Sequence, residues 1–555
     1  MNFDRSIDPY RPLFHFSPPH GWWGGGPDGT IYHNGYYHVF YQYDPYMTCT
    51  SGNASWGHTV SRDLVHWEHR PVAIGPTPFS AEQYKAFAQS KLVKTIDRSK
   101  TPPIVYDREV CFSGSAVIND GVPTLIYTGM LHGLQDVRIM MGRSQCIATS
   151  DDGMLTWKKH PQNPVITHPP DELVDPSELD RLYEWTEGIL PSPRRWLDQF
   201  GQDRAFDGRS LDTAESQATR GQLTAWHDPH VWREGNMWYM GLGCGFLGVG
   251  GAILLYRSSD LISWEYLHPL CVGTESEYNR WLVPDFFPLR DKHVLIVAAT
   301  SRGRSGKSIY MVGSYNNNRF TPEVEGFLDT HPMACFHCPR TLIDQNGRRI
   351  MMGVLAERRL VSDNLHGWAG VLSLPRLLEL GSDNRLLISP VKEVCSSGAP
   401  DWAVEKVELL KNTPFALRDG KGDCLEIIAE IDMGSAEEVV LKLRRSANGE
   451  EETVVCFDRK KNVLMVDTTR SSLSVDTGHT VSETPFIGKK IDRLRLHVFL
   501  DRSVIEVFAN QRVSASDRLY PMRDDSLGIQ VMVRAGSALL TSLKIWRKES
   551  IFFPS

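Results

Sequence analysis

Three side chains stand out as groups that could transfer protons. His227 and Asp228 are adjacent, and His20 lies near the amino terminus. Imidazole and carboxyl groups can donate and accept protons, so these three are the candidate catalytic residues. Structural roles remain open for each of them. Asp228 could cap a turn at the start of a strand, and either histidine could be structural or exposed.

Motifs for a metal or a cofactor are missing from the sequence. It has no Walker loop, no GxGxxG segment that opens a helix, and no HExxH pair. The one CxxC, formed by Cys335 and Cys338, lacks the second pair that a structural zinc site usually needs. We therefore expect buried thiols there, and we predict no metal and no cofactor.

Composition and charge narrow the class of protein. The chain has 555 residues, 41% of them hydrophobic and 23% charged, which predicts a globular protein with two or more domains. A net charge of -7 without a basic block argues against nucleic-acid binding, and no apolar run is long enough for a membrane span. The first residues lack the layout of a signal peptide, so we expect a cytoplasmic protein that acts on a small molecule. The sequence does not indicate an oligomeric state.

Short alternating runs joined by glycine-containing turns predict β-hairpins in the first part of the chain. A Ser-Asp or Ser-Arg-Asp segment followed by Trp recurs between them, at Ser61, Ser150 and Ser259. Hairpins that recur at intervals of roughly 60 to 110 residues indicate the blades of a β-propeller, with an open β-sandwich as the alternative. The predicted hairpins are residues 31–41, 117–127, 230–242 and 341–354.

Residues 171–225 interrupt this pattern. The segment is polar and contains proline, and residues 177–185 and 193–200 could be helical. It leads directly into Trp226-His227-Asp228-Pro229, which we place at the start of an inner strand. An insertion of this length is often functional, so it could be a lid over a central pocket, or else an exposed excursion.

The last part of the chain has a different pattern of predicted strands. Residues 401–555 consist of short predicted strands separated by polar turns, which suits a β-sandwich. We therefore expect an all-β protein, with a β-propeller over residues 1–395 and a β-sandwich over residues 401–555.

Five motifs in the right order resemble those of glycoside hydrolase family 32, the β-fructofuranosidases. They are FYQYDP at 40–45, WGHTVSRDLVHW at 56–67, FSGSAV at 112–117, GVLSLPR at 370–376 and DRSVIEVFAN at 501–510. The resemblance covers nearly the whole chain. It implies a five-bladed β-propeller followed by a C-terminal β-sandwich, which agrees with the blades predicted from the hairpins.

The same resemblance implies that both catalytic carboxylates of the family are replaced. Retaining glycoside hydrolysis uses two carboxyl groups about 5 Å apart, one as the nucleophile and one as the acid/base. Gly26 stands at the position of the family's nucleophilic Asp, and Leu282 at the position of its acid/base Glu. The family's third carboxylate is kept as Asp228.

These replacements imply a pocket that is wider and less polar than a sugar site. The glycines at 24–26 remove side-chain volume, while Leu282 and Val283 make the wall apolar. The residues that we expect to contact the substrate are Trp22, Trp23, Gly26, Asp28, Gln42, Trp56, Phe112, Ser113 and Leu282.

We therefore hypothesise a repurposed, non-hydrolytic enzyme of secondary metabolism, a pseudo-glycosidase that acts as a cyclase or catalyses a cycloaddition, dehydration or isomerisation. Such an enzyme would orient and polarise a small hydrophobic metabolite without a nucleophile. One alternative is a β-fructofuranosidase in which Asp28, Glu275 or Glu277 replaces the lost carboxylates. The other is a non-catalytic carbohydrate-binding protein.

Overall fold

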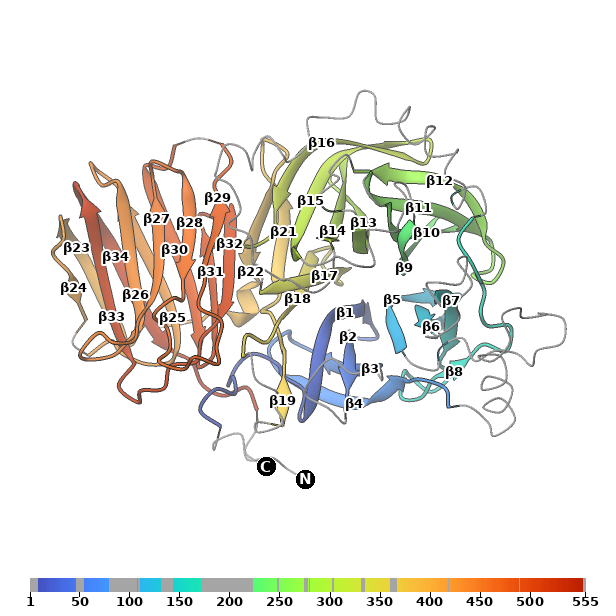
Figure 1. Ribbon diagram of the computed structural model, residues 1–555, viewed down its shortest axis with the longest axis horizontal. Helices are drawn as coiled ribbons and strands as arrows, with labels where there is room; N and C mark the ends of the chain where they lie inside the picture. Colours follow the sequence, from blue (N-terminus) through green and yellow to red (C-terminus); the bar gives the residue numbers. More distant parts are fainter. Residues whose placement is uncertain are drawn as a thin grey trace.

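The computed structural model describes residues 8–45, 54–78, 107, 110–130, 143–170, 173, 223–246, 249–273, 278, 280–301, 304–330, 335–359, 367–417, 419–488 and 490–552. Nearly all regular structure in these residues is β-strand, and the strands form two bodies that lie side by side (Figure 1). A short 3-10 helix, η4 (Lys392–Val394), follows the last strand of the first body. The expected all-β fold, a five-bladed β-propeller with a C-terminal β-sandwich, is confirmed.

Five antiparallel sheets form the propeller, and each runs outward from an inner strand. The blades are β1 (Gly21–His33), β2 (Tyr36–Asp44), β3 (Ser55–Ser61) and β4 (Trp67–Ile74); β5 (Val110–Asn119), β6 (Val122–Met130), β7 (Arg143–Thr149) and β8 (Lys158–Lys159); β9 (Leu223–Glu234), β10 (Met237–Phe246), β11 (Gly250–Ser258) and β12 (Glu265–Val272); β13 (Arg280–Leu289), β14 (Lys292–Ser301), β15 (Arg304–Asn316) and β16 (Arg319–Phe327); and β17 (Phe336–Ile343), β18 (Arg349–Leu355), β20 (Val371–Leu372), β21 (Arg376–Leu380) and β22 (Leu386–Pro390). The short strand β19 (Trp368–Ala369), which lies in the chain between β18 and β20 of blade 5, pairs in parallel with β1 and so joins the sheet of blade 1.

The hairpin turns follow directly from their residue types. Asn34 and Gly35 have φ values of 50° and 81°, as a two-residue type I′ turn requires, and Asp120 and Gly121 repeat this with 48° and 87°. Asparagine, aspartate and glycine tolerate positive φ better than other residues. All four predicted hairpins are present, between β1 and β2, β5 and β6, β9 and β10, and β17 and β18.

The repeated Ser-Asp segment forms a turn held by its own side chains. In blade 1, Ser61 Oγ accepts a hydrogen bond from the Leu64 amide at 2.9 Å, and Asp63 Oδ1 accepts from the next two amides at 2.9 and 2.8 Å. Ser258 and Asp260 make the equivalent bonds in blade 3. The repeat in the sequence is therefore a repeat of one local turn, which the side-chain oxygens stabilise.

The second body is a sandwich of two six-stranded antiparallel sheets with an apolar core between them. The first sheet has the order β23 (Trp402–Leu410), β34 (Ser537–Arg547), β25 (Cys424–Asp432), β30 (Arg493–Asp501), β31 (Val504–Ala509) and β32 (Val513–Arg518). The second has the order β24 (Phe415–Ala416), β33 (Gly528–Ala535), β26 (Glu438–Arg445), β27 (Thr453–Asp458), β28 (Val463–Asp467) and β29 (Val481–Pro485).

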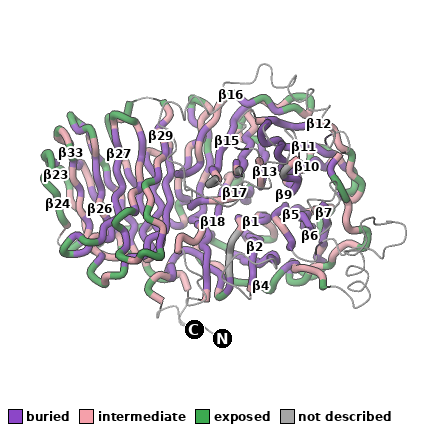
Figure 2. Tube along the Cα trace, viewed as in Figure 1, coloured by how far each residue is buried: buried purple, intermediate pink, exposed green. Residues whose placement is uncertain are grey.

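The two bodies share part of their core. Phe336 and Leu372 of blade 5 belong to the same buried cluster as Phe499 and Phe508 of the sandwich. Figure 2 shows buried residues along the strands on both sides of this junction. A continuous apolar interface of this kind holds domains in a fixed relation.

Some expectations fall on residues that the structure does not describe. The helices expected at 177–185 and 193–200, and nearly all of the expected lid over 171–225, lie outside the described residues. In the part of the chain that is described, no helix has the length and apolar character needed to cross a membrane.

Candidate active site

All five inner strands break register at the same level of the propeller. The breaks fall between Trp23 and Pro27 in β1, Phe112 and Gly114 in β5, His227 and His230 in β9, Leu282 and Asp285 in β13, and His337 and Arg340 in β17. A β-bulge turns a side chain away from its regular direction and is common beside active sites. The five bulges therefore mark one ring of redirected residues around the propeller axis.

Three residues in this ring have backbone conformations that cost energy. Asp228, Val283 and Cys338 have φ values of 64°, 49° and 45°. Positive φ is especially unfavourable for a β-branched residue such as Val283. Such conformations persist where the surrounding structure imposes them, and they cluster at functional sites.

Two buried carboxyl groups lie in this ring. Ser113 Oγ donates a hydrogen bond of 2.6 Å to Oδ1 of Asp28, whose Oδ2 has no hydrogen-bond partner among the described residues. Asp228 Oδ2 accepts a hydrogen bond from the Val283 amide at 3.1 Å. The same oxygen lies 2.7 Å from Nδ1 of His227, without the alignment of a hydrogen bond. The two carboxyl groups thus have different surroundings.

These surroundings push the two carboxyl pKa values in opposite directions. Burial raises the pKa of Asp28 well above its usual range, and the nearby negative charge of Asp228 adds to this. Burial acts in the same sense on Asp228, but His227, Arg340 and the Val283 amide outweigh it, so the pKa of Asp228 is lowered. Burial also lowers the pKa of His227 and keeps its ring neutral. At neutral pH, Asp228 is ionised while Asp28 holds its proton to higher pH than an ordinary Asp.

Arg340 is a cation that acts on both carboxyl groups. It is buried, its charge acts on both Asp28 and Asp228, and its guanidinium donates to the carbonyl of Pro284. Because the protein interior screens charge weakly, one buried guanidinium can favour the ionised form of a nearby carboxylate strongly. Sequence reasoning missed Arg340, although it follows the Cys335–Cys338 motif by two residues.

Gly25 and Gly26 do not widen the pocket, so that expectation is wrong for these two residues. A Cβ atom on Gly26 would overlap the carbonyl and the Cβ of Cys338, and one on Gly25 would overlap the side chain of Gln42. Both glycines are therefore needed because other atoms pack directly against their backbone. Cys338 fills the space where an Asp at position 26 would have to lie.

This packing predicts that Gly26→Ala destabilises the protein by about 1–3 kcal/mol, because a backbone carbonyl must move to make room. Thermal or urea unfolding would measure the loss. Gly478→Ala is the matched control, since its new Cβ would have no neighbour nearer than 3.6 Å. The control should change stability by less than about 0.5 kcal/mol. Equal stability of the Gly26→Ala variant and the wild type would contradict the packing.

The other expected site residues lie in several environments. Gln42, Ser113, His227 and Asp228 are buried in the ring, while Phe112 and Leu282 are half-buried there. The ring of Phe112 stacks on His227 with centroids 5.7 Å apart. Trp22 and Trp23 belong to β1, but their side chains, together with Glu275 and Glu277, lie outside the described residues.

Two expected site residues are placed away from the carboxyl pair. His20 is exposed, and its ring packs edge-on against Tyr43 at 6.3 Å. Trp56 is fully buried, donates from Nε1 to the Phe112 carbonyl at 3.0 Å and packs in the core between blades 1 and 2. Neither placement brings the side chain to Asp28 or Asp228.

The cysteines and a separate polar cluster were considered as metal ligands. Cys335 is fully buried, as expected for a packed thiol, whereas Cys338 is half-buried. In the described residues, Cys395, Glu426 and His497 lie close enough together to hold an ion. Glu426, however, already accepts from the Ser396 amide at 2.6 Å and lies 2.7 Å from His497 Nε2, which suits a structural hydrogen-bond network.

Two domain models of one family match most of the chain, in the same order as its two bodies. The glycosyl hydrolases family 32 N-terminal domain matches residues 15–98, 96–180 and 209–390, and the family 32 C-terminal domain matches residues 401–547. The chain belongs to glycoside hydrolase family 32. Residues 181–208, inside the expected lid, lie between the matched segments.

Full-length relatives of this family 32 chain are named as hydrolases. A sucrose-6-phosphate hydrolase of Zymomonas mobilis is 30% identical over 97% of this chain and 92% of its own length. A raffinose invertase of Escherichia coli is 28% identical over 98% of this chain and 96% of its own length. The crystal structure of exo-inulinase from Aspergillus awamori covers 100% of both chains with a TM-score of 0.74 and 23% identity, which supports the fold.

These relatives overturn the hypothesis of a non-hydrolytic enzyme. The family and the names of its members support a glycosidase, and nothing in them supports a cyclase, a pseudo-glycosidase or a role in secondary metabolism. The physical error was to treat Gly26 and Leu282 as the whole site. The residues at those two positions cannot do the chemistry, but a second buried carboxyl, Asp28, lies near Asp228.

Proposed function

We propose that this family 32 protein is a β-fructofuranosidase-type hydrolase in which Asp28 and Asp228 form the catalytic pair. The observation that carries the proposal is that two buried carboxyl groups share one site, in surroundings that raise the pKa of Asp28 and lower the pKa of Asp228. Two titratable groups whose pKa values are driven apart are the usual mark of an acid and a base or nucleophile. The substrate class is a β-fructoside such as sucrose, in keeping with the names of the relatives.

The proposed roles follow from charge. Asp28, which holds its proton, protonates the glycosidic oxygen as the bond to the fructosyl anomeric carbon breaks. Asp228, ionised, either attacks that carbon or removes a proton from the attacking water. Its 3.1 Å bond from the Val283 amide fixes the carboxylate. The anomeric form of the first fructose released, followed by NMR, distinguishes attack on carbon from attack through water.

The substrate must displace neighbouring side chains to reach this pair. Asp28 and Asp228 are 0% and 3% exposed. Phe112, stacked on His227, and Leu282, next to Val283, are the half-buried neighbours, so we propose that the substrate enters past them. Both are apolar and suit contact with the face of a sugar ring.

The direct test is to incubate the protein with sucrose, raffinose and levan and to measure released fructose. Fructose release above background, abolished when Asp28 or Asp228 is changed to Asn, supports the proposal. Release that persists in both variants would refute the assignment of the pair. Sugar binding without any release would favour the alternative, a non-catalytic carbohydrate-binding protein, which the near-complete burial of both carboxyl groups also fits.

The carboxyl pair also predicts a bell-shaped pH profile for kcat/KM of sucrose hydrolysis. On the acid side, activity rises at a pH below the usual pKa range of an Asp, because the pKa of Asp228 is lowered. The falling limb lies well above that range because the pKa of Asp28 is raised, and activity is lost once Asp28 gives up its proton. Since the groups interact, the two limbs report the pair as a whole. A profile that falls within the ordinary Asp range would contradict the assignment.

A further inference from the structure

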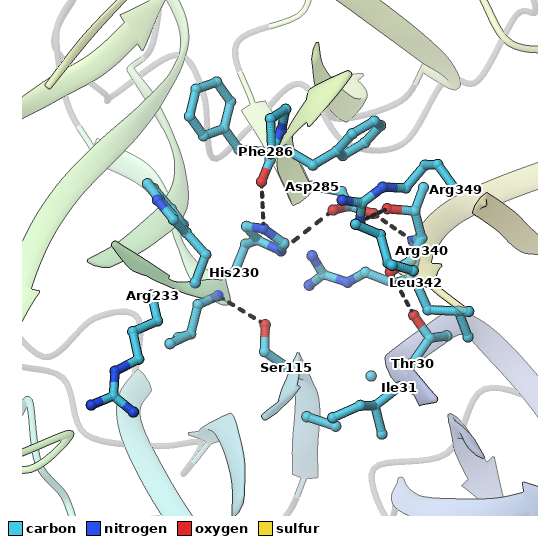
Figure 3. Close-up of a pocket in the computed structure, with 18 of the residues that line it drawn as sticks. Thr30, Ile31, Ser115, His230, Arg233, Asp285, Phe286, Arg340, Leu342 and Arg349 are labelled. Carbon is cyan, nitrogen blue, oxygen red and sulfur yellow. Dashed lines mark hydrogen bonds and ion pairs between the residues drawn. The ribbon is translucent and has the colours of Figure 1, made fainter. Parts of the chain in front are cut away.

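A cavity of about 630 Å³ lies beyond the carboxyl pair along the propeller axis. Its lining includes Thr30, Ser115, His230, Asp285 and Arg340, one from each of the five inner strands. In each strand these residues follow the bulge that builds the carboxyl site. The cavity opens at the surface, where its lining includes residues at the ends of strands, such as Ile343, which is 49% exposed. The cavity therefore lies on the opposite side of the bulges from the start of the inner strands, and neither Asp28 nor Asp228 belongs to its lining. Figure 3 shows the side chains around it.

Most polar side chains in the cavity wall are already engaged with the protein. Thr30 Oγ1 donates to the Thr341 carbonyl at 2.9 Å. Ser115 Oγ donates to the Pro229 carbonyl at 2.9 Å and accepts from the Val231 amide at 3.0 Å. His230 Nε2 lies 2.9 Å from the Phe286 carbonyl oxygen, and Figure 3 shows this contact beside the cavity. Such groups define the shape of the cavity but leave little capacity to bind a ligand.

The exceptions are two guanidinium groups, Arg340 and Arg349, which Figure 3 labels on one side of the cavity. Neither forms an ion pair within 4.0 Å among the residues that the structure describes. Arg340 Nε and Nη2 and Arg349 Nε have no hydrogen-bond partner in the same set. Arg349 stacks over Phe287 at 4.4 Å and donates one bond, of 3.3 Å, to Thr341 Oγ1. Both groups thus keep unused donors.

The carboxylates that line the cavity do not pair with these donors. Asp285 is the acid that both arginines share, and its Oδ2 already accepts from the Thr341 amide at 2.5 Å. Glu234 accepts from Trp232 Nε1 at 2.6 Å. The third arginine of the lining, Arg233, has its own partners, with Asp120 at 3.2 Å. Among the described residues neither lining carboxylate lies within 4.0 Å of Arg340 or Arg349, so their unpaired N–H donors favour a ligand with several acceptor oxygens.

We propose that this cavity binds a small phosphate-bearing ligand through Arg340 and Arg349. Guanidinium groups bind phosphate oxygens with paired hydrogen bonds. Aromatic side chains complete the lining, among them Tyr32, Trp232 and Phe286, so the rest of the ligand meets ring faces. The volume exceeds what phosphate alone would fill and suits a monosaccharide phosphate.

A ligand bound in the cavity would also change the pKa values of the carboxyl pair, because Arg340, which lines the cavity, acts on that pair as well. Its charge acts on Asp28 and Asp228 as well as on Asp285. An anion against Arg340 offsets that charge, so the pKa of both carboxyl groups should rise. This second step rests on the proposed function, and it predicts that phosphate moves both limbs of the pH profile to higher pH.

The binding step is tested without any activity measurement. Isothermal titration calorimetry of the full chain with inorganic phosphate, glucose 6-phosphate, glucose and acetate compares the ligands. We expect glucose 6-phosphate to bind, inorganic phosphate to bind more weakly, and glucose and acetate to give no signal up to about 10 mM. Glucose binding equal to that of glucose 6-phosphate, or no phosphate binding at all, would overturn the proposal.

Matched arginine variants locate the site. Arg349→Met should weaken glucose 6-phosphate binding by at least about tenfold, whereas Arg233→Met, which removes the same charge from the same lining, should change it less than about twofold. Arg349→Lys keeps the charge but loses the planar fork, so it should give an intermediate affinity and serves if the methionine variant does not fold. Unchanged binding in Arg349→Met, or an equal loss in Arg233→Met, would place the anion elsewhere. Lost binding with normal fructose release would leave the proposed function intact.

Discussion

Asp228→Asn is expected to lower kcat/KM for sucrose hydrolysis by at least about 10³-fold. The amide has the same shape and can still accept the 3.1 Å bond from the Val283 amide, so the fold should be kept. It carries no negative charge, however, and can neither attack the anomeric carbon nor remove a proton from water. Released fructose, measured on freshly folded protein of unchanged melting temperature, gives the result.

Two further variants make this expectation specific. Asp120→Asn changes an exposed aspartate in a hairpin turn and should leave the rate within about twofold of the wild type. Asp28→Asn should cost about 10²–10⁴-fold on sucrose, but much less on a β-fructoside whose leaving group needs no protonation. If Asp228→Asn retained a tenth or more of the wild-type rate, the catalytic pair would have to be sought elsewhere.

Arg376→Met is expected to destabilise the protein by about 3–5 kcal/mol, because it would remove the guanidinium group that pairs with two buried carboxylates. Arg376 of β21 is fully buried between the propeller and the sandwich. It lies 2.9 Å from Asp329 and 2.5 Å from Glu506 of β31. Glu506 also accepts a hydrogen bond of 2.6 Å from the Leu374 amide, so one side-chain network joins the two bodies. Melting temperature and the urea midpoint measure the loss.

The control for this variant is a surface pair that also bridges the two bodies. Arg512 and Asp383 lie 2.8 Å apart, with side chains 32% and 43% exposed. Water and salt screen such a pair, so Arg512→Met should cost less than about 1 kcal/mol. Arg376→Lys keeps the charge but loses the forked geometry and should fall between the two. A loss in Arg376→Met no larger than in Arg512→Met would show that the buried network contributes little.

Glu506 belongs to the DRSVIEVFAN motif, and its bonds to Arg376 and to the Leu374 amide join the two bodies. Asp285 has two roles. It accepts a backbone hydrogen bond, as a structural residue does, yet it also lines the cavity with the two arginines. A motif tells which residues belong together in a fold, but it does not tell which of them face a cavity.

Local chemistry in the sequence determined the strands, the hairpins and the family. Asn34 and Gly35 form their turn because few other residues adopt the positive φ values that it needs. Ser61 and Asp63 hold their turn with their own oxygen atoms. Each of these contacts joins residues within a few positions of one another, so the order of residues is sufficient to predict it.

Only the tertiary structure decided what the site contains. Asp28 and Asp228 are far apart in the chain and come near each other because five inner strands bulge at one level. Burial and the charge of Arg340 then set their protonation, and neither can be calculated from spacing. The same packing shows why Gly26 must be glycine: Cys338, more than 300 positions later, occupies the space that a side chain would need. Contacts between distant segments depend on how the whole propeller closes, which local residue preferences do not specify.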